Sequence, residues 1–347
     1  MDRDKLQTLH NYLAKLSLKT KEFQVSDMTL RDDSFHPVAY TRTGTLTHNT
    51  HAGQMKLLLA DEMSIMLGLL HICSKSKTTL RDLEAGSPKV AVVVAGAAPG
   101  IHFTDLVCTF GFVDFHLYDP APHGWYPPLE HRPNVTLYTQ KFTVDTAREW
   151  KDNKQYNHVI FLSDLRTGDG MEIDGAAVFS QSKFENAVSD DMENQRQMTK
   201  LIGACYSVLK FRLRYYNDDT PPDKKTLEYL DGTIYFEGYA PNHSTETRLH
   251  VTDLNSVKTY DIQVYQDQLF YHNQVTRKHQ LFYHTHVPPN PTNEELTYDN
   301  AHARFVKHFL LQHLPSVSDY HVRDSDGSRF DHTRIRVLLD NFKLLLT

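Results

Sequence analysis

An apolar run that ends in a loop of small residues is the part of this sequence best suited to chemistry. Four of the residues 90–94 are valine, which is typical of a buried parallel strand. The loop that follows consists of Gly96, Ala97, Ala98, Pro99 and Gly100. Its glycines and its proline predict a tight turn, where the backbone can approach a ligand closely. A buried strand, this loop and a predicted helix over 101–110 together make the nucleotide pocket of a doubly wound α/β sheet.

The loop sequence favours a nucleoside over a dinucleotide. A dinucleotide fold requires G-x-G-x-x-G, whose second glycine makes room for the pyrophosphate, and this chain has an alanine there. The acidic residue after the next predicted strand is Asp119, whose carboxylate can accept hydrogen bonds from both ribose hydroxyls. S-adenosylmethionine fits such a pocket. On the loop alone, a dehydrogenase and another α/β protein with a tight turn remain alternatives.

Strands and helices that alternate along the chain must position this loop. Strands are predicted over 90–96, 113–119, 135–139, 158–163, 206–213, 233–239 and 247–253. Helices are predicted over 54–73, 101–110 and 187–205, and a capping box of Thr292 and Glu295 predicts a further helix that reaches His313. This alternation predicts an α/β, Rossmann-like fold with helices on both faces of a mostly parallel sheet. The last two strands have no helix between them, which predicts an antiparallel edge.

Both ends of the chain are predicted to extend this domain. Leucines at positions 6, 9, 13 and 16 predict an amphipathic helix, and the polar residues 24–52 predict an irregular arm. Apolar residues between 335 and 346 predict a final helix whose apolar stripe belongs to the core. The predicted division is a helix and arm over 1–52 and one domain with a C-terminal helical extension over 53–347.

Composition limits the partners and the compartment. The chain has 347 residues and a net charge of −6, so a nucleic-acid partner must be held by a local basic patch. The three cysteines lie far apart, and the histidine pairs at 48/51 and 284/286 match no metal-binding pattern, so no metal is expected. No signal core is found and no apolar run approaches the roughly 20 residues of a membrane span, so a cytoplasmic location without membrane contact is expected.

Four further motifs accompany the loop in a fixed order. They are Gly53-Gln54-Met55-Lys56-Leu57-Leu58-Leu59, Phe161-Leu162-Ser163-Asp164-Leu165-Arg166, Ser207-Val208-Leu209-Lys210-Phe211-Arg212 and Ala240-Pro241-Asn242-His243-Ser244-Thr245-Glu246-Thr247-Arg248. Together the five motifs resemble the poxvirus cap-specific mRNA 2′-O-methyltransferases, which also serve as regulatory subunits of viral poly(A) polymerase. The resemblance runs from about residue 50 to the C-terminal helix. The FtsJ-type ribosomal RNA methyltransferases share the underlying Lys-Asp-Lys-Glu order.

The resemblance implies a catalytic tetrad of Lys56, Asp164, Lys210 and Glu246. Taken singly, each of these residues has an ordinary structural explanation, such as a helix-end charge or a strand-end cap. However, Asp164 follows the strand 158–163, where open sheets bind ligands, and Lys210 interrupts an otherwise apolar strand. We expect Lys210 to take the proton of a ribose 2′-hydroxyl, the two acids to orient it, and Lys56 to fix the ribose. A lysine acts as a base only when burial or a second cation, here Lys56 or Arg248, lowers its pKa.

The resemblance also implies S-adenosyl-L-methionine as the cofactor. Its predicted contacts are Gln54, Gly96, Ala97, Ala98, Pro99, Gly100, His102, Asp119, Lys141, Phe142, Thr143 and Asp164. In this assignment Asp119 holds the ribose, and Phe142 and Thr143 lie beside the adenine. Ordinary core packing is the alternative explanation for Phe142.

On the RNA side, the resemblance implies a pocket for N7-methylguanine. This positively charged base requires aromatic faces for stacking and acids for its ring-edge donors. The candidate residues are Tyr215, Asn217, Asp218, His243, Gln266, Arg212 and Arg248, with Phe35 or Tyr40 of the arm as a second aromatic. His243 stands where the family has a tyrosine, and Gln266 stands where a carboxylate is expected.

The sequence therefore predicts an enzyme that methylates the 2′-oxygen of the first transcribed nucleotide of capped mRNA, converting cap-0 to cap-1. One alternative is an FtsJ-like methyltransferase that acts on uncapped structured RNA. Another is a processivity or regulatory subunit of a viral poly(A) polymerase, either instead of the enzyme or in addition to it. The predicted partners are accordingly capped mRNA and a poly(A) polymerase catalytic subunit.

Overall fold

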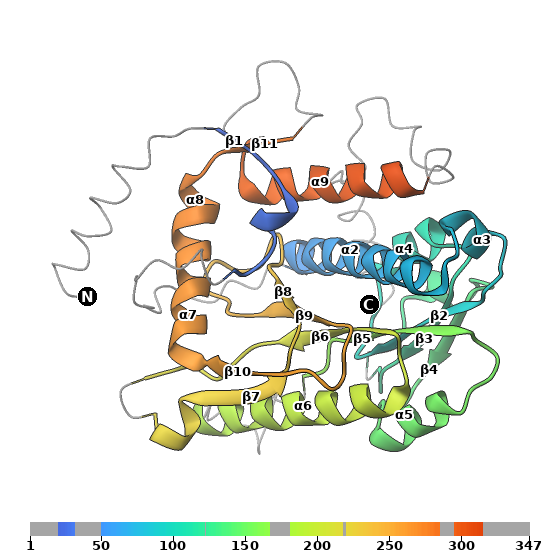
Figure 1. The fold of residues 1–347 in the computed structure, drawn as a ribbon, viewed down its shortest axis with the longest axis horizontal. Coiled ribbons are helices and arrows are strands. Elements are labelled where there is room, and N and C mark those ends of the chain that lie inside the picture. The colour runs from blue at the N-terminus through green and yellow to red at the C-terminus, as the bar shows by residue number, and fades with distance from the viewer. Residues whose placement is uncertain are drawn as a thin grey trace, which may run out of the picture.

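The structure is a computed structural model that describes residues 20–31, 50–121, 123–166, 181–217, 220–284 and 295–314 (Figure 1). Several sequence predictions lie outside the described residues. These are the helices predicted over 6–16 and 335–346, the two aromatic residues Phe35 and Tyr40, the histidines His48 and His286, and Asp218.

A seven-stranded sheet forms the centre of the fold. In spatial order its strands are β4 (Val135–Tyr138), β3 (Asp114–Tyr118), β2 (Val90–Ala95), β5 (His158–Ser163), β6 (Tyr206–Phe211), β9 (Thr247–Val251) and β8 (Thr233–Tyr235). The strands from β4 to β6 run parallel, and β9 is antiparallel to both of its neighbours. The predicted α/β fold, with a mostly parallel sheet and an antiparallel edge, is confirmed.

Helices cover both faces of the sheet (Figure 1). On one face lie α2 (Thr50–Ser76) and α4 (Phe103–Thr109), with α9 (Tyr298–His313) packed on α2; on the other lie α5 (Val144–Lys151) and α6 (Gln181–Ile202). Strand β2 shows how the sequence allows burial on both faces of the sheet. Its valines 90, 92 and 94 pack in the core with α2 and α4, and residues 91, 93 and 95 pack in the core with α5 and α6. A strand buried on both faces is apolar at every position.

The strand order reverses between β2 and β5. From β2 the chain continues to β3 and β4 on one side, and it returns to β5 and β6 on the other side. Loops that leave the carboxyl ends of two such strands diverge, and open α/β sheets bind their ligands in the resulting crevice. In this chain, the loops at that point begin at Gly96 and Asp164.

Helix α2 is long and apolar enough to cross a membrane by length and composition, over the 24 residues Gly53–Ser76. This corrects the expectation that no run approaches the length of a membrane span. The helix packs against α9, α4 and the strands β5 and β6, and 61% of its most apolar window is buried inside the fold. Its side chains Met55, Leu59 and Met66 are fully buried. Core packing therefore accounts for its apolar composition.

The structure adds short elements that the sequence analysis did not predict. They are α3 (Leu80–Glu84), the strand pairs β1 (Lys21–Glu22) with β11 (Phe282–Tyr283) and β7 (Thr226–Leu230) with β10 (Val257–Asp261), α7 (Ile262–Tyr271), a π-helical turn (His272–Thr276), α8 (Arg277–His279), and 3₁₀ turns at Val25–Asp27, Pro127–Leu129 and Pro222–Lys224. Most are too short for an apolar period to be visible. In β10, four of five residues are exposed, so its sequence lacks the apolar positions by which a strand is recognised.

The helix that ends at His313 begins at Tyr298, so its predicted capping box is wrong. The capping residue is Thr297, whose hydroxyl accepts the backbone N–H of Asn300 at 3.5 Å. A threonine two positions after Glu295 supplies the cap that the sequence analysis assigned to Thr292.

Candidate active site

A cavity lies where β2 and β5 end, at the reversal of strand order. A Cβ atom on Gly96 would lie 3.0 Å from the backbone carbon and oxygen of Asp164, closer than real Cβ contacts normally come. Gly96 also has a φ of +86°, which side-chain-bearing residues rarely adopt. Both constraints require glycine at this position, because the loops after the two strands touch one another here.

The cavity is lined by the loop after β2, by helix α2 and by polar residues from three other elements. Gln54 and Asp61 come from α2, the whole loop 96–100 contributes, and His102, Asp164 and Arg248 complete the polar wall. The structure thus brings together the predicted cofactor residues of α2, the loop, His102 and Asp164.

Gln54, His102 and Asp61 form a hydrogen-bonded chain along one wall. The Gln54 side-chain oxygen lies 3.2 Å from Nδ1 of His102, and Oδ2 of Asp61 lies 3.1 Å from Nε2 of the same ring. Gln54 and Asp61 are seven residues apart in the sequence, which places them on one face of the helix. Sequence reasoning missed Asp61, although this spacing from Gln54 was visible.

The remaining predicted cofactor residues do not line this cavity. Asp119 follows β3, and its carboxylate accepts the backbone N–H of Ala121 at 2.7 Å. Phe142 is 5% exposed and packs edge-on against Tyr118, which agrees with the core-packing alternative. Thr143 caps α5, and Lys141 is exposed.

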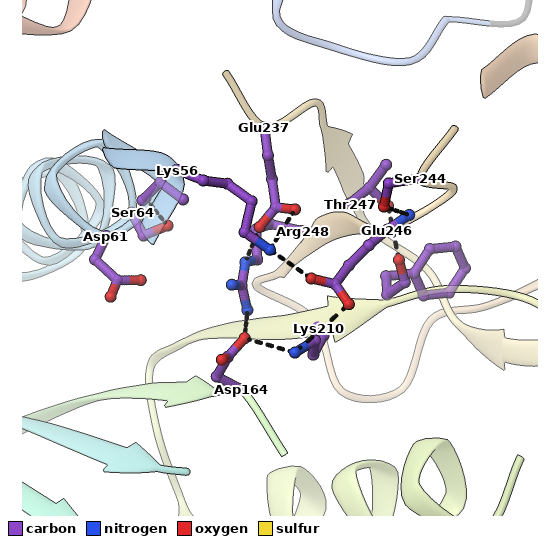
Figure 2. Close-up of polar contacts among 12 residues, drawn as sticks. Lys56, Asp61, Ser64, Asp164, Lys210, Glu237, Ser244, Glu246, Thr247 and Arg248 are labelled. Atoms are coloured by element: carbon purple, nitrogen blue, oxygen red, sulfur yellow. Dashed lines mark hydrogen bonds and ion pairs between the residues drawn. The ribbon is translucent and has the colours of Figure 1, made fainter. Parts of the chain in front are cut away.

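Beside the cavity, six charged side chains close a ring in which the sign of the charge alternates (Figure 2). Each carboxylate contacts two cations, and each cation contacts two carboxylates. In order around the ring, the members are Lys56, Glu246, Lys210, Asp164, Arg248 and Glu237, which contacts Lys56 again. The ring contains the whole predicted tetrad.

Three contacts of the ring are short. Lys56 Nζ lies 2.6 Å from Glu246 Oε1, and Arg248 Nη1 lies 2.6 Å from Asp164 Oδ1. Arg248 also donates from Nε to Glu237 Oε1 at 2.7 Å, while the contact of Lys56 Nζ with Glu237 Oε2 is 3.4 Å. Lys56 is therefore fixed by one close carboxylate and Arg248 by two.

Lys210 is held differently. Its Nζ lies 3.3 Å from Asp164 Oδ1 and 3.5 Å from Glu246 Oε2, so it has no carboxylate within 3 Å in the ring. The strand β6 is buried along its length, and the Lys210 side chain is 11% exposed. Lys210 is the cation that the ring holds least tightly.

Burial and opposite charge act against each other on the pKa values of the ring. Burial alone lowers the pKa of Lys56, but Glu237 and Glu246 outweigh it and raise that pKa above its usual value. Burial raises the pKa of Asp164, but neighbouring cations, first Arg248, lower it to about 2. The two lysines likewise hold the pKa of Glu246 well below its usual value despite burial. Lys56, Asp164 and Glu246 are all charged at neutral pH.

A comparison with families of known proteins matches nearly the whole chain. The family is described as poly(A) polymerase regulatory subunit, and its model matches residues 35–339. The chain belongs to the poly(A) polymerase regulatory subunit family. A search of curated proteins gives no match. The matched region includes the cavity and all six members of the ring.

In this member of the regulatory subunit family, one acid of the ring was missed by sequence reasoning. Glu237 follows β8, whose residues 234 and 235 are apolar or aromatic, and it is itself almost fully buried. An acid after an apolar run is the same signal that singled out Asp164. Arg248 was expected at the RNA, but its side chain is 4% exposed and both of its partners are inside the ring.

Arg212, the second arginine expected at the RNA, is also buried and paired. Its guanidinium lies 2.7 Å from Glu185 of α6, and the same guanidinium stacks 4.3 Å from the centre of the Tyr215 ring. Glu185 also accepts the backbone N–H of Tyr215 at 3.1 Å. Arg212 and Glu185 thus hold Tyr215 in place, and the charge of Arg212 is paired with Glu185.

The other described residues expected at the cap lie in α7 and in two separate loops. Gln266 is buried, and its side-chain oxygen accepts the backbone N–H of Tyr216 at 2.9 Å. Asn217 is exposed and accepts a hydrogen bond from the hydroxyl of Thr220. His243 is partly buried in the loop between β8 and β9. Within the described residues, no group of three or more His, Cys, Asp or Glu side chains could hold a metal ion.

Proposed function

We propose that this regulatory subunit family member is an S-adenosylmethionine-dependent methyltransferase that modifies the 2′-oxygen of the first transcribed nucleotide of capped mRNA. The position of Asp164 carries the proposal. Asp164 lines the cavity at the end of β2, and its carboxylate contacts Lys210 in the ring. Asp164 therefore connects the cavity with the predicted base, Lys210. Methyl transfer requires such adjacency, because cofactor and hydroxyl must be aligned within about 3–3.5 Å.

The residues of the cavity fit the proposed cofactor. The loop is closed to side chains at two places: a Cβ atom on Gly96 would meet the backbone of Asp164, and one on Gly100 would lie 2.8 Å from a carbon of Leu129. Gln54, Asp61 and His102 supply polar groups to the lining of the cavity. Asp119 lies outside this lining; it directly follows β3, the strand next to β2, where a carboxylate can accept hydrogen bonds from ribose hydroxyls. When bound, the cofactor supplies an electrophilic methyl group on its sulfonium.

The unequal contacts of the ring divide the roles of the two lysines. Lys56 is fixed by Glu246 at 2.6 Å and its pKa is raised, so it stays charged and can orient the ribose. Asp164 and Glu246 each have a closer cation than Lys210, which weakens their hold on its ammonium group. We therefore assign the role of general base to Lys210. In this role Lys210 acts as the neutral amine, because an ammonium group has no lone pair for a further proton. As the 2′-oxygen gains the methyl group, the hydroxyl proton passes to the neutral Nζ of Lys210, and Asp164 and Glu246 hold that nitrogen in place.

A second function, regulation of a poly(A) polymerase, is favoured by the family match over residues 35–339. The partner in that role is a polymerase catalytic subunit. The two functions are compatible in one chain, since the family that the sequence resembles combines them. A purely regulatory role gives no reason for six charged groups to be withdrawn from water, because removing charges from water carries a large penalty.

Transfer of a labelled methyl group to three RNAs tests the enzymatic proposal. The substrates are a cap-0 RNA, the same RNA without a cap, and a capped RNA with a 2′-deoxy first nucleotide. Transfer to the first substrate alone is expected. Equal transfer to the uncapped RNA would favour an FtsJ-like enzyme for structured RNA. Absence of transfer to all three would overturn the enzymatic proposal, and tail-length assays with a polymerase would then test the regulatory function.

A further inference from the structure

We propose that Glu237, a residue outside the Lys-Asp-Lys-Glu tetrad, is a positioning residue that closes the ring opposite Lys210 and directs Arg248 and Lys56 onto the two acids of the tetrad. This inference rests on the proposed methyl transfer. The tetrad supplies four of the six ring members, and Glu237 and Arg248 complete the ring.

Glu237 is well placed to act through its neighbours. Its side chain is fully inaccessible, and its two ion-pair partners are Arg248, 2.7 Å from Oε1, and Lys56, 3.4 Å from Oε2. In the ring, Glu237 stands three places from Lys210 in either direction (Figure 2). Any effect of Glu237 on Lys210 must therefore pass through the other members.

The guanidinium of Arg248 transmits the position of Glu237 to Asp164. Arg248 donates from Nε to Glu237 Oε1, and its Nη1 lies 2.6 Å from Asp164 Oδ1. Because the guanidinium is planar and rigid, fixing Nε also fixes the direction of Nη1. Glu237 therefore determines which oxygen of Asp164 the arginine engages, and Lys210 contacts that same oxygen at 3.3 Å.

Lys56 carries the position of Glu237 to the other acid. Its ammonium group is shared between Glu237 and Glu246, which raise its pKa against the effect of burial. Without Glu237, the ring would lose one of its three carboxylates. Lys56 and Arg248 would then each have one carboxylate partner in the ring. The cations that pair with Asp164 and Glu246 would then no longer be fixed from a second side.

The test compares the full-length protein with Glu237→Gln in methyl transfer to capped RNA. We expect kcat to fall on the order of 10- to 100-fold, as small misplacements of catalytic groups do. The Kd for S-adenosylmethionine should change less than about threefold. In NMR titrations of the lysine side chains, assigned with Lys56→Arg, the pKa of Lys56 should fall. Loss of stability alone would produce neither this separation of kcat from cofactor binding nor the change at Lys56.

Asp299→Asn is the matched control, because Asp299 pairs with buried Arg277 in another part of the fold. It should lower the melting temperature and leave kcat unchanged. An unchanged kcat in Glu237→Gln, with an active wild type, would overturn this inference and leave the proposed function intact. An inactive wild type would overturn both. If the Gln variant does not fold, Glu237→Asp is measured instead; it keeps the charge but shortens the reach, so the same loss of kcat is expected.

Discussion

Lys210 and Arg248 lie directly opposite each other on the antiparallel strands β6 and β9, and both contact the same oxygen of Asp164. Directly opposed residues of a sheet project to the same face, so the pairing of these strands brings the two cations together. Arg248 is the nearer, at 2.6 Å against 3.3 Å for Lys210. The antiparallel edge of the sheet therefore supplies the cation that neutralises Asp164 and leaves Lys210 loosely held.

Lys210→Ala should abolish methyl transfer while cofactor binding persists. A positioned general base contributes about 10²- to 10⁴-fold to a rate, so turnover should fall at least about 100-fold. Lys210 does not line the cavity, so the Kd for S-adenosylmethionine should stay near the wild-type value. Single-turnover transfer and calorimetric titration of the cofactor measure the two quantities.

Lys75→Ala is a suitable control for the loss of a lysine. Lys75 is exposed in the last turn of α2, the helix that carries Lys56 at its other end. Its removal should leave transfer unchanged. Near-normal turnover of Lys210→Ala would show that Lys210 is not the base.

The depressed pKa of Asp164 makes stability depend on pH in the acid range. Its folded pKa of about 2 lies below the ordinary value of about 3.9, so the ionised group stabilises the fold above about pH 4. This contribution is lost as the pH falls toward the folded pKa. The difference in melting temperature between the wild type and Asp164→Asn should therefore be largest near pH 6 and narrow toward pH 3. A difference that is constant over this range would contradict the assigned charge. Asp145→Asn, at a largely exposed carboxylate, is the control and should have little effect at any pH.

Much of the central sheet could be predicted because its strands are apolar and its parallel part alternates with helices. The predicted strand 158–163 has the observed bounds of β5, and the predicted strand 90–96 exceeds β2 by one residue. The elements beyond the sheet edge could not be predicted in the same way. Strand β10 exposes most of its side chains, and β1 and β11 have two residues each, so their sequences carry no period. Such segments take their conformation from the chain segments with which they pair.

The site was predictable where a charge stands out against an apolar background. Lys210 interrupts a buried strand, and Asp164 follows one, so the positions of both carried information. The partners of Arg248 could not be deduced, because pairing with Lys210 depends on the register of β6 and β9. The partner of Arg212 could not be deduced either. Arg212 contacts Glu185 because α6 packs on the sheet, and the sequence does not reveal this packing.

Gly96→Ala should impair both stability and cofactor binding. The new alanine would have a φ of +86°, and its Cβ would lie 3.0 Å from the backbone of Asp164. The two loops would therefore have to separate. Gly86→Ala is the matched control, because Gly86 has a φ of +81° and nothing lies within 4 Å of its Cβ position. Both variants carry backbone strain of about 1–2 kcal/mol, but only the first moves the loops. Chemical denaturation should show a similar cost of backbone strain in both variants. Cofactor titration should show a loss of affinity in Gly96→Ala alone. Equal cofactor affinity in both variants would exclude the cavity as the cofactor site.

Tyr215→Ala should weaken recognition of the cap without affecting the cofactor. The Tyr215 backbone is fixed by Glu185, and its ring is fixed by the guanidinium of Arg212, so the aromatic face is held ready for a base. Stacking on an aromatic side chain contributes about 1–3 kcal/mol per base, which corresponds to a loss of roughly 5- to 150-fold in affinity. Fluorescence titration with an N7-methylguanosine cap dinucleotide measures the affinity for the cap. Tyr283→Ala, at an exposed tyrosine of β11, is the control. Unchanged cap affinity in Tyr215→Ala would show that this tyrosine does not bind the cap. Equal transfer to capped and uncapped RNA would show that the enzyme does not select for the cap.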